Sequence, residues 1–437
     1  MSQQDPRQRE QWSSEPAFVF SMAAAAVGLG NLWRFPYMVG ENGGAPFIIA
    51  YLLALVVVAL PVMMLEVGVG RLAQGSAVHT FRQVHRWGFI FGWAVVLLTV
   101  LITSYYLVVT GWTMGYAVNA ATVSVSEFDE FTSGYNSIWF FLAVTAIATG
   151  ILIKGVSAIE TFSRWLMPIL IIVILILVGI ATQVDGFAEA RNFMFQADFS
   201  LLTSGSLWIF AFGQAFYTLA VGQGYLVTYG SYIPNRTHVP RACIVVAVTE
   251  TMVALLAGFM IFPYVFTYGF DPGEGSQLAF STLPRVFEEM TGGAYLAILF
   301  FFLFFAAAFS SCLAGLKVVI AAVSEEMKLS HTRAVIAVGV LMLFLGMPSA
   351  LSFTPVELTV AGMPFLDFVD QFAGTNVVIA SGVIGAGLFA WLVPRHRIRE
   401  SLETTVDYWK WRMVIVGRAL PFAAAIFLLW RLVSALV

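Results

Sequence analysis

The sequence predicts an all-α integral membrane protein of eleven transmembrane helices, with the first and sixth unwound at mid-membrane. Of its 437 residues, 59% are hydrophobic and only 11% are charged, and the mean hydropathy is +0.86. Soluble domains carry roughly a quarter charged residues, so this chain cannot cover a water-exposed surface. Eleven apolar runs are long enough to cross a bilayer, which takes about 20 residues. Two of these runs contain glycine pairs near their middle.

Short polar loops separate the eleven runs. The runs lie near residues 16–40, 45–70, 88–117, 136–153, 164–183, 203–230, 240–268, 293–324, 333–350, 366–393 and 414–436. The longest polar stretches, near 118–135, 184–202, 269–292 and 394–413, leave no room for a soluble domain. We therefore expect a single transmembrane domain over residues 1–437. It comprises one repeat near 16–183, a second near 203–393 and an extra helix near 414–436.

Charge and cysteine content exclude several other classes of protein. The net charge of −3 is spread along the chain and gives no support for nucleic-acid binding. Cys243 and Cys312 lie inside apolar runs without metal-ligand spacing, which predicts reduced packing residues. The polar start, from Met1 to Glu10, does not resemble a cleavable signal peptide.

Basic residues predict the orientation in the membrane. An odd number of spans places the two termini on opposite sides, and Lys and Arg concentrate on the cytoplasmic side. With the N-terminus inside, only Arg191, Arg285 and Arg431 fall outside. The inner side receives Arg7, Arg9, Arg71, Arg82, Arg86, Lys154, Arg164, Arg236, Arg241, Lys328, Arg333, Arg395, Arg397, Arg399, Lys410, Arg412 and Arg418. We expect a cell (inner) membrane protein with a cytoplasmic N-terminus and an extracytoplasmic C-terminus.

The interruptions in runs one and six predict a binding site. They are Val27–Asn31 and Ala220–Gly224, where glycines weaken the helix. Either could instead serve close helix packing through small residues. Together they occupy equivalent places if helices 1–5 and 6–10 form inverted repeats, and such a pair points to a transporter site. Unwound carbonyls can coordinate a cation while half-helix N-termini receive an anion, an arrangement suited to an amino acid.

Specific motifs resemble the neurotransmitter:sodium symporters, a family that is itself a type case of the broken-helix architecture. Arg9 and Trp12, the run Ala26–Pro36 and the run Glu41–Gly44 carry the resemblance most strongly. It continues through Glu66, Gly70-Arg71, Tyr105-Tyr106, Trp112, Gln214–Thr218, Ala257–Phe262, Ser310-Ser311, Lys328–Ser330, Asp370 and Ala373–Thr375. The resemblance covers helices 1 to 10, and many relatives have a twelfth helix. It implies a sodium-coupled amino acid importer working by alternating access, with no organic cofactor.

The resemblance implies two sodium sites. The first comprises Ala26, Asn31, Thr218 and Glu250, and the second comprises Ala24, Val27, Ala307, Ser310 and Ser311. Ligand sets made only of oxygen suit a hard cation. A helix-packing pair that bonds its own backbone remains the alternative interpretation of Ser310 and Ser311.

Glu250 departs from the family pattern. Aligned on Ala257–Phe262, it falls where many relatives place an asparagine that ligates the first sodium, near the site where many animal members need chloride. A carboxylate at mid-membrane is costly and is a functional hypothesis by default. Our hypothesis is that Glu250 supplies the negative charge, so that transport needs no chloride. A neutral, hydrogen-bonded glutamate and a one-residue shift that puts Thr249 in this place both remain open.

The resemblance also implies a substrate pocket. Amine transporters of the family carry an aspartate where Gly28 stands, so the substrate's own carboxylate is expected here, against the Leu29 and Gly30 amides and the Tyr106 hydroxyl. The implied pocket comprises Ala25, Ala26, Gly28, Leu29, Gly30, Ile102, Tyr106, Val109, Tyr217, Thr218, Ala220, Gln223, Ser311 and Gly315. These mostly small or apolar residues favour a hydrophobic or aromatic side chain, and Ala25 and Gly315 are expected to leave space for it.

Two gates are implied on either side of the pocket. Arg34 and Asp370 would form the outer gate, with Tyr106 and Tyr217 closing beneath it. On the inner side, Arg9 would pair with Glu325, and Trp12 and Tyr232 would pack nearby. Lys317 has no counterpart in the family pattern; it lines the inner exit or reaches to the membrane interface.

Three other functions can be compared with the sequence. A sodium-coupled carrier of an amine, a taurine-like compound or an osmolyte stays open, although Gly28 argues against plain amines. A non-transporting amino acid sensor would not need the ion sites. An intramembrane enzyme would need a catalytic polar cluster, and the sequence contains no nucleophile–base or metal motif. Substrate identity, stoichiometry and oligomeric state are left open.

Overall fold

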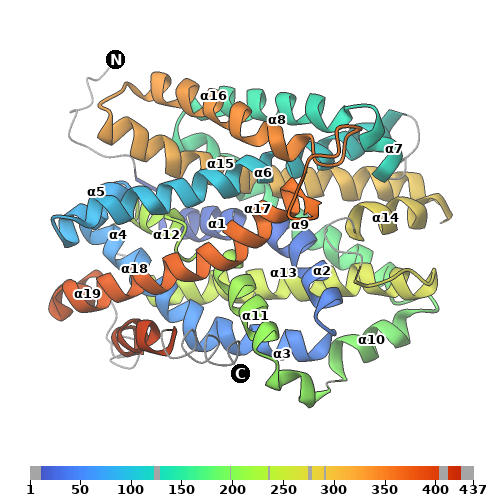
Figure 1. The fold of residues 1–437 in the computed structure, drawn as a ribbon, viewed down its shortest axis with the longest axis horizontal. Coiled ribbons are helices and arrows are strands. Elements are labelled where there is room, and N and C mark those ends of the chain that lie inside the picture. Colours follow the sequence, from blue (N-terminus) through green and yellow to red (C-terminus); the bar gives the residue numbers. More distant parts are fainter. Residues whose placement is uncertain are drawn as a thin grey trace.

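The chain is almost entirely helical, as predicted (Figure 1). The computed structural model describes residues 11–122, 128–196, 198–234, 237–273, 278–289, 292–402 and 412–424. The long helices run roughly parallel to the longest axis of the molecule. A short antiparallel hairpin pairs Thr359 of β1 (Thr359–Val360) with Pro364 of β2 (Met363–Pro364).

The helices follow the order of the predicted apolar runs. They are α1 (Glu15–Ala26), η1 (Gly30–Arg34), α2 (Phe35–Glu41), α3 (Ala45–Ala54), η2 (Leu55–Ala59), α4 (Leu60–Ala73), α5 (Ala77–Val84), α6 (Gly88–Thr122), α7 (Phe128–Ser133), α8 (Asn136–Leu152), α9 (Val156–Ala181), α10 (Phe187–Phe195), η3 (Phe199–Thr203), α11 (Gly205–Thr218), α12 (Tyr225–Gly230), α13 (Val239–Thr267), α14 (Leu278–Glu289), α15 (Gly293–Glu326), α16 (His331–Ala350), α17 (Phe365–Val369), η5 (Asp370–Val377), α18 (Val378–Leu392) and α19 (Arg395–Ser401). Residues 412–424 form a further helix.

Seven helices of the described residues are long and apolar enough to cross a membrane, and the bent pair of α1 with η1–α2 makes an eighth. The other three predicted runs correspond to the 17-residue α8, the divided pair α11 and α12, and the partly described helix at 412–424. The structure is thus compatible with eleven spans. The fifth helix begins earlier than the predicted 164, because Glu160 and Arg164 form an ion pair of 2.7 Å within its first turns.

Both predicted interruptions are real breaks in the helices. The first helix bends by 44° between α1 and η1, and the amides of Asn31 and Leu32 both bond the Gly28 carbonyl. The sixth is unwound between α11 and α12, where Gly222 and Gly224 adopt positive φ angles of 74° and 76°. Glycine adopts such angles without steric cost, which explains the glycine pair at this point.

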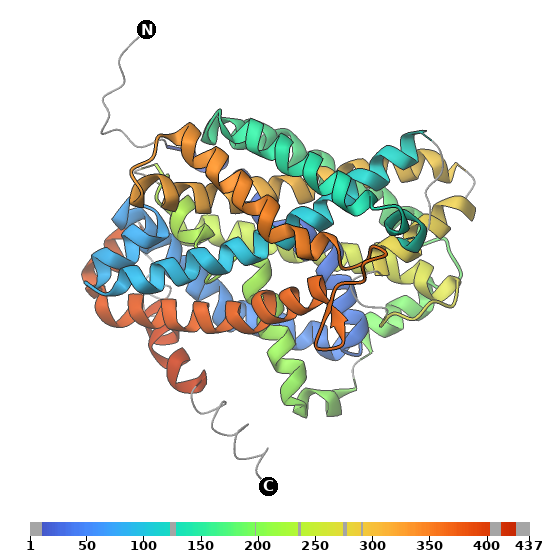
Figure 2. The same cartoon turned by 45° about the horizontal axis from the view of Figure 1, so that its top comes forward.

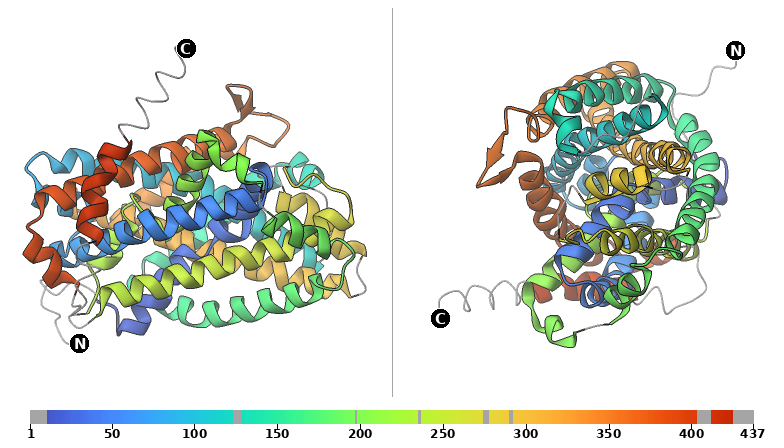
Figure 3. Two further views of the ribbon diagram at one scale, coloured as in Figure 1. Left: turned by 90° about the horizontal axis from the view of Figure 1, so that it is seen from below. Right: turned by 90° about the vertical axis from the view of Figure 1, so that its right-hand side faces the viewer.

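The two breaks lie inside the bundle. α1 packs against α9, α13 and α15, while α12 packs against α4, α5 and α15. The right-hand view of Figure 3 looks along the helices and shows α8 and α9 at the outside. α16 lies beside α8 on one face (Figure 2). Large apolar side chains cover the outside, such as Trp165 and Phe344, which are 71% and 75% exposed. An apolar exterior of this kind is suited to lipid.

The bundle has two ends, which we name by their elements. The α5–α19 end, at the left of Figure 1, carries α5, α12 and α19. The α7–α14 end, at the right, carries α2, α7, α10 and α14. The breaks in the first and sixth helices lie between these two ends.

Candidate functional site

A cluster of buried polar side chains surrounds Glu250 beside both breaks. Asn31 Nδ2 donates to Glu250 Oε1 at 2.7 Å and to the Glu250 carbonyl at 2.9 Å. The Thr218 hydroxyl donates to the same carboxylate oxygen. The hydroxyls of Tyr51 and Thr251 lie 3.4 and 3.3 Å from the carboxylate. We call Asn31, Thr218 and Glu250 the first cluster; it joins η1, the end of α11 and the middle of α13.

The first cluster fits the chemistry of a sodium site. The Glu250 side chain is fully buried, and it is the acidic member of the group. Glu250 contacts Asn31 and Thr218, whereas Thr249 is only half-buried on the same helix, so the geometry favours the alignment that uses Glu250. Carboxylate, amide and hydroxyl oxygens are the donors that hard cations prefer.

A second group of oxygens joins α15 to the end of α1. The Ser310 hydroxyl lies 2.8 Å from the Ala24 carbonyl and 2.7 Å from the Ala307 carbonyl. The Ser311 hydroxyl lies 3.0 Å from the Ala25 carbonyl and 3.4 Å from that of Ala24. We call Ala24, Ala307, Ser310 and Ser311 the second cluster. Ser310 thus bonds its own helix and also a neighbouring one, so the helix-packing alternative stays beside the sodium site.

The remaining residue predicted for the second sodium is also near this cluster. Val27 is fully buried and directly follows α1, where its N–H donates to the Ala23 carbonyl. Ala26, predicted for the first sodium, is the buried last residue of α1. Both therefore lie at the point where the helix ends and backbone groups are released from helical bonding.

Gly28 lies between the two clusters and has no room for a side chain. A Cβ atom there would lie 2.2 Å from Ser311 Oγ and 2.4 Å from the Tyr106 hydroxyl. The Tyr106 hydroxyl accepts a bond of 2.7 Å from the Leu29 amide, one of the two amides predicted to receive a substrate carboxylate. The carbonyl of Gly30 accepts 2.9 Å from Gln214. A side chain at position 28 would therefore require the Ser311 and Tyr106 hydroxyls to move.

The expected space beside Gly315 is filled. A Cβ atom on Gly315 would lie 2.4 Å from the Tyr225 hydroxyl and 2.5 Å from Thr103 Oγ1. The sequence did not predict that Tyr225 and Thr103 lie beside Gly315, because this contact depends on how α6, α12 and α15 are rotated against each other. The space expected at this position is therefore occupied by the hydroxyl groups of Tyr225 and Thr103.

The other predicted pocket residues surround the same region. The side-chain amide of Gln223 donates to the Tyr217 carbonyl at 3.3 Å, so it is bound to the backbone beside the break. The backbone carbonyl of Gln223 accepts from the Thr99 hydroxyl. Ala220 has a φ angle of 54°, uncommon for a residue with a side chain. The remaining members are buried on their helices: Ala25, Ile102, Val109, Tyr217 and Thr218.

Arg34 forms a buried charged network above the pocket. Its Nε atom lies 3.2 Å from both carboxylate oxygens of Asp370. Its other nitrogens donate to Gln214 at 2.6 Å and Thr375 at 2.7 Å. The guanidinium lies 4.7 Å from the centre of the Tyr217 ring. Arg34 and Asp370, the residues predicted for the outer gate, are therefore in direct contact.

Asp370 is held by two tyrosines that the gate prediction did not include. The Tyr37 and Tyr105 hydroxyls each donate to this carboxylate at 2.6 Å. Tyr105 also lies 3.1 Å from the Tyr217 hydroxyl. Asp370 and Arg34 lie in or beside π-helical turns, η5 and η1, which often mark functional sites in membrane and soluble helices.

The predicted inner gate lies at the α5–α19 end. The Trp12 amide donates to the Tyr232 carbonyl at 2.9 Å, and its indole N–H donates to the Tyr229 carbonyl at 3.2 Å. The rings of Trp12 and Tyr232 meet edge to face at 6.2 Å. Glu325 accepts the Ser76 amide at 2.8 Å. The predicted partner Arg9 lies outside the described residues.

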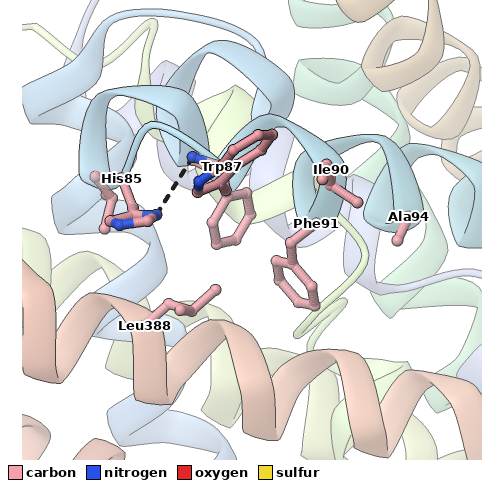
Figure 4. Close-up of a pocket in the computed structure, with 9 residues that line it drawn as sticks. His85, Trp87, Ile90, Phe91, Ala94 and Leu388 are labelled. Carbon is pink, nitrogen blue, oxygen red and sulfur yellow. Dashed lines mark hydrogen bonds between the residues drawn. The ribbon is translucent and has the colours of Figure 1, made fainter.

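A separate apolar cavity lies away from these clusters, where the turn between α5 and α6 meets α18 (Figure 4). It measures about 350 Å³ and is lined by residues such as Phe91, Ile90 and Leu388. At its edge the Trp87 amide donates to His85 Nδ1 at 3.3 Å. Within the described ranges, no three His, Cys, Asp or Glu side chains gather as ligands for a metal.

Comparison with known proteins decides the family. The model of the sodium:neurotransmitter symporter family matches residues 9–138 and 130–437, nearly the whole chain. The chain belongs to this family. The resemblance inferred from the motifs is thereby confirmed. The family consists of sodium-coupled secondary transporters, so the protein is a multi-pass membrane transporter and not an enzyme.

Relatives from bacteria agree over most of their length. An uncharacterized sodium-dependent transporter of Haemophilus influenzae is 30% identical over 91% of this chain and 92% of its own. The sodium-dependent transporter YhdH of Bacillus subtilis is 33% identical over 89% and 88%. Among solved structures, MhsT in complex with L-phenylalanine superposes with a TM-score of 0.92 at 33% identity, covering 97% of this chain and 99% of MhsT.

Proposed function

We propose that this symporter imports a hydrophobic or aromatic amino acid with two sodium ions and needs no chloride. The observation that carries the proposal is the buried carboxylate of Glu250 between Asn31 and Thr218, beside both helix breaks. In this proposal the domain consists of two inverted five-helix repeats and one extra helix. The N-terminus is cytoplasmic, so the α5–α19 end faces the cytoplasm.

The first sodium binds at the first cluster. Asn31, Thr218 and Glu250 supply side-chain oxygens and Ala26 supplies its carbonyl. Because the Glu250 carboxylate provides a negative charge inside the protein, a chloride ion is not required to balance the sodium. The second sodium binds at the second cluster, where carbonyls of Ala24, Val27 and Ala307 join the hydroxyls of Ser310 and Ser311.

The substrate carboxylate binds between the two sodium ions. It takes the place beside the Leu29 and Gly30 amides and the Tyr106 hydroxyl, where the half-helix beginning at Leu29 presents its positive end. Gly28 supports this position, since it brings no acidic side chain of its own and the Tyr106 and Ser311 hydroxyls lie against it. The small and apolar pocket favours an apolar side chain, and L-phenylalanine in the similar structure MhsT supports an aromatic substrate.

The cycle alternates between the two gates. The Arg34–Asp370 network and the contacts of Trp12 with Tyr229 and Tyr232 both hold in this structure, so it represents an occluded form. Sodium and substrate enter when the outer network parts; release follows when Trp12 leaves Tyr232 and the Arg9–Glu325 contact opens. Each sodium charge gains about 2.3 kcal/mol when it moves inward through 100 mV. Two coupled ions therefore support steep accumulation.

Uptake into proteoliposomes tests the proposal. We would screen twenty labelled amino acids, taurine and simple amines, with external sodium or with choline in its place. Sodium-dependent accumulation of phenylalanine, tryptophan or leucine is the expected result. If only taurine or an amine accumulates, the proposed substrate class is wrong. Sodium-dependent binding without uptake of any solute would favour a sensor, and uptake that persists in choline would overturn sodium coupling.

A further inference from the structure

Lys317 is a buried cation that none of the sites above uses. It lies near the cytoplasmic half of α15, and only 5% of the residue is exposed. A lysine within a transmembrane segment is costly and marks a functional position by default. Its neighbours on α15, Leu316 and Val318, are buried and apolar, so the surrounding sequence does not require a charge for solubility.

The position of Lys317 relates it to the second cluster. It follows Ser310 by seven residues on the same helix. Seven residues complete almost two helical turns, so both residues share one face and are separated by about 10 Å along the axis.

Lys317 also contacts the inner gate. Its Nζ atom lies 5.7 Å from the centre of the Tyr232 ring. The Tyr232 carbonyl accepts the Trp12 amide at 2.9 Å, so Lys317 lies against the residues that close the α5–α19 end. Glu325 follows eight residues later on α15, near the end of the helix. Along α15, Lys317 therefore lies between the serines of the second cluster and Glu325, which was predicted for the inner gate.

We infer that Lys317 is a fixed cation in the release path of the second sodium, where it promotes release to the cytoplasm and opposes rebinding. The inference rests on the proposed sodium site at Ser310 and Ser311. Once Trp12 leaves Tyr232, an ion passing between the cytoplasm and the serines must pass the ammonium group. The second cluster contains only neutral oxygens, so Lys317 is the formal charge that α15 itself brings near it.

The size of the effect follows from the separation. Two unit charges about 10 Å apart change a binding constant by between about twofold, in a water-filled path, and about 15-fold, at the effective dielectric constant of a protein surface. A fixed charge acts on the bound ion whichever side it entered from, so a similar fold-change is expected for cytoplasmic and for external sodium. Passage of the ion past the ammonium group is particular to the cytoplasmic side, because sodium from outside reaches the second cluster while the inner gate is closed.

Lys317→Met and Lys317→Arg separate charge from shape. We would measure phenylalanine uptake in right-side-out membrane vesicles loaded with increasing internal sodium. With Lys317→Met, internal sodium should inhibit half-maximally at a concentration between about twofold and about 15-fold lower than in the wild type. Lys317→Arg should behave as the wild type. The external sodium concentration that gives half-maximal uptake should fall by a similar factor in Lys317→Met and stay unchanged in Lys317→Arg.

Several outcomes would overturn this role. Unchanged internal inhibition in Lys317→Met would exclude it, and so would equal shifts in Lys317→Met and Lys317→Arg, which would show that shape matters instead of charge. A shift in external sodium dependence that is equally large in Lys317→Arg would show that Lys317 supports the closed gate structurally. Lys317→Gln serves if the methionine variant does not fold, as judged by sodium-dependent phenylalanine binding in detergent.

A Ser310→Ala variant keeps the two proposals distinguishable. If this variant leaves the sodium dependence unchanged, the second sodium site is wrong and the proposed function needs revision. If Ser310→Ala weakens sodium binding while Lys317→Met leaves internal inhibition unchanged, only the role of Lys317 fails.

Discussion

The two oxygen clusters differ in charge although they lie on either side of one residue, Gly28. The first cluster contains the buried carboxylate of Glu250, while the second consists of serine hydroxyls and backbone carbonyls. The second also has a lysine two turns away on its own helix. In the proposed function, the first ion is therefore held by a full negative charge and the second by dipoles alone. We therefore expect the first site to bind sodium more tightly and the second site to release it more easily.

Glu250→Gln should have the largest effect. The substitution keeps the shape but removes the charge, and a charge pair at about 4 Å contributes up to about 4 kcal/mol at an effective dielectric constant of 20. We expect the sodium concentration for half-maximal uptake to rise by about two orders of magnitude, and added chloride to restore part of the loss. Titrating sodium with and without chloride measures both. Glu250→Asp retains the charge and should lose much less; an unchanged titration for Glu250→Gln would mean that the carboxylate does not serve sodium.

Gly28→Ala should disturb both clusters together. Its new Cβ atom would overlap Ser311 Oγ and the Tyr106 hydroxyl, and such overpacking typically costs about 1–3 kcal/mol. We expect substrate binding to weaken by between about fivefold and about 100-fold, measured with labelled phenylalanine in detergent. Gly150→Ala is the matched control, since no atom lies within 4 Å of a Cβ at that position. Equal binding by the two variants would contradict the crowding at Gly28.

Ser310→Ala should have a moderate effect that is confined to sodium. Loss of one neutral hydroxyl removes about 1 kcal/mol, which raises the half-maximal sodium concentration by about fivefold. Thr145→Ala provides the control, because Thr145 donates only to its own helix, at 2.8 Å to Phe141, far from the site. If both variants shift the sodium titration alike, Ser310 acts through helix packing and not through an ion.

Tyr51→Phe should have the smallest effect. Its hydroxyl lies 3.4 Å from both Glu250 oxygens, a long contact compared with the 2.7 Å bond from Asn31. We expect sodium affinity to change by less than about threefold, because weak hydrogen bonds contribute little net energy. A loss comparable to that of Glu250→Gln would show that Tyr51, and not the carboxylate charge, organises the first cluster.

Sequence reasoning could find the breaks but not their surroundings. The glycine pairs at 28–30 and 222–224 carry a local signal, because glycine weakens a helix wherever it stands. The contacts of Tyr51 and Thr251 with Glu250, and of Tyr225 with Gly315, depend on the rotation of packed helices, which no local pattern contains. The same holds for Tyr37 and Tyr105 at the outer gate. The roles of the site residues came from the family motifs, and composition alone would have given only a multi-span membrane protein.

The measurement that tests the central claim most directly is phenylalanine uptake by the wild-type protein in sodium gluconate, sodium chloride and choline chloride. In the proposed function Glu250 provides a negative charge beside the first sodium, so equal uptake is expected in the two sodium salts and none in choline. Uptake that requires chloride would contradict the account, since Glu250 would then not replace the anion.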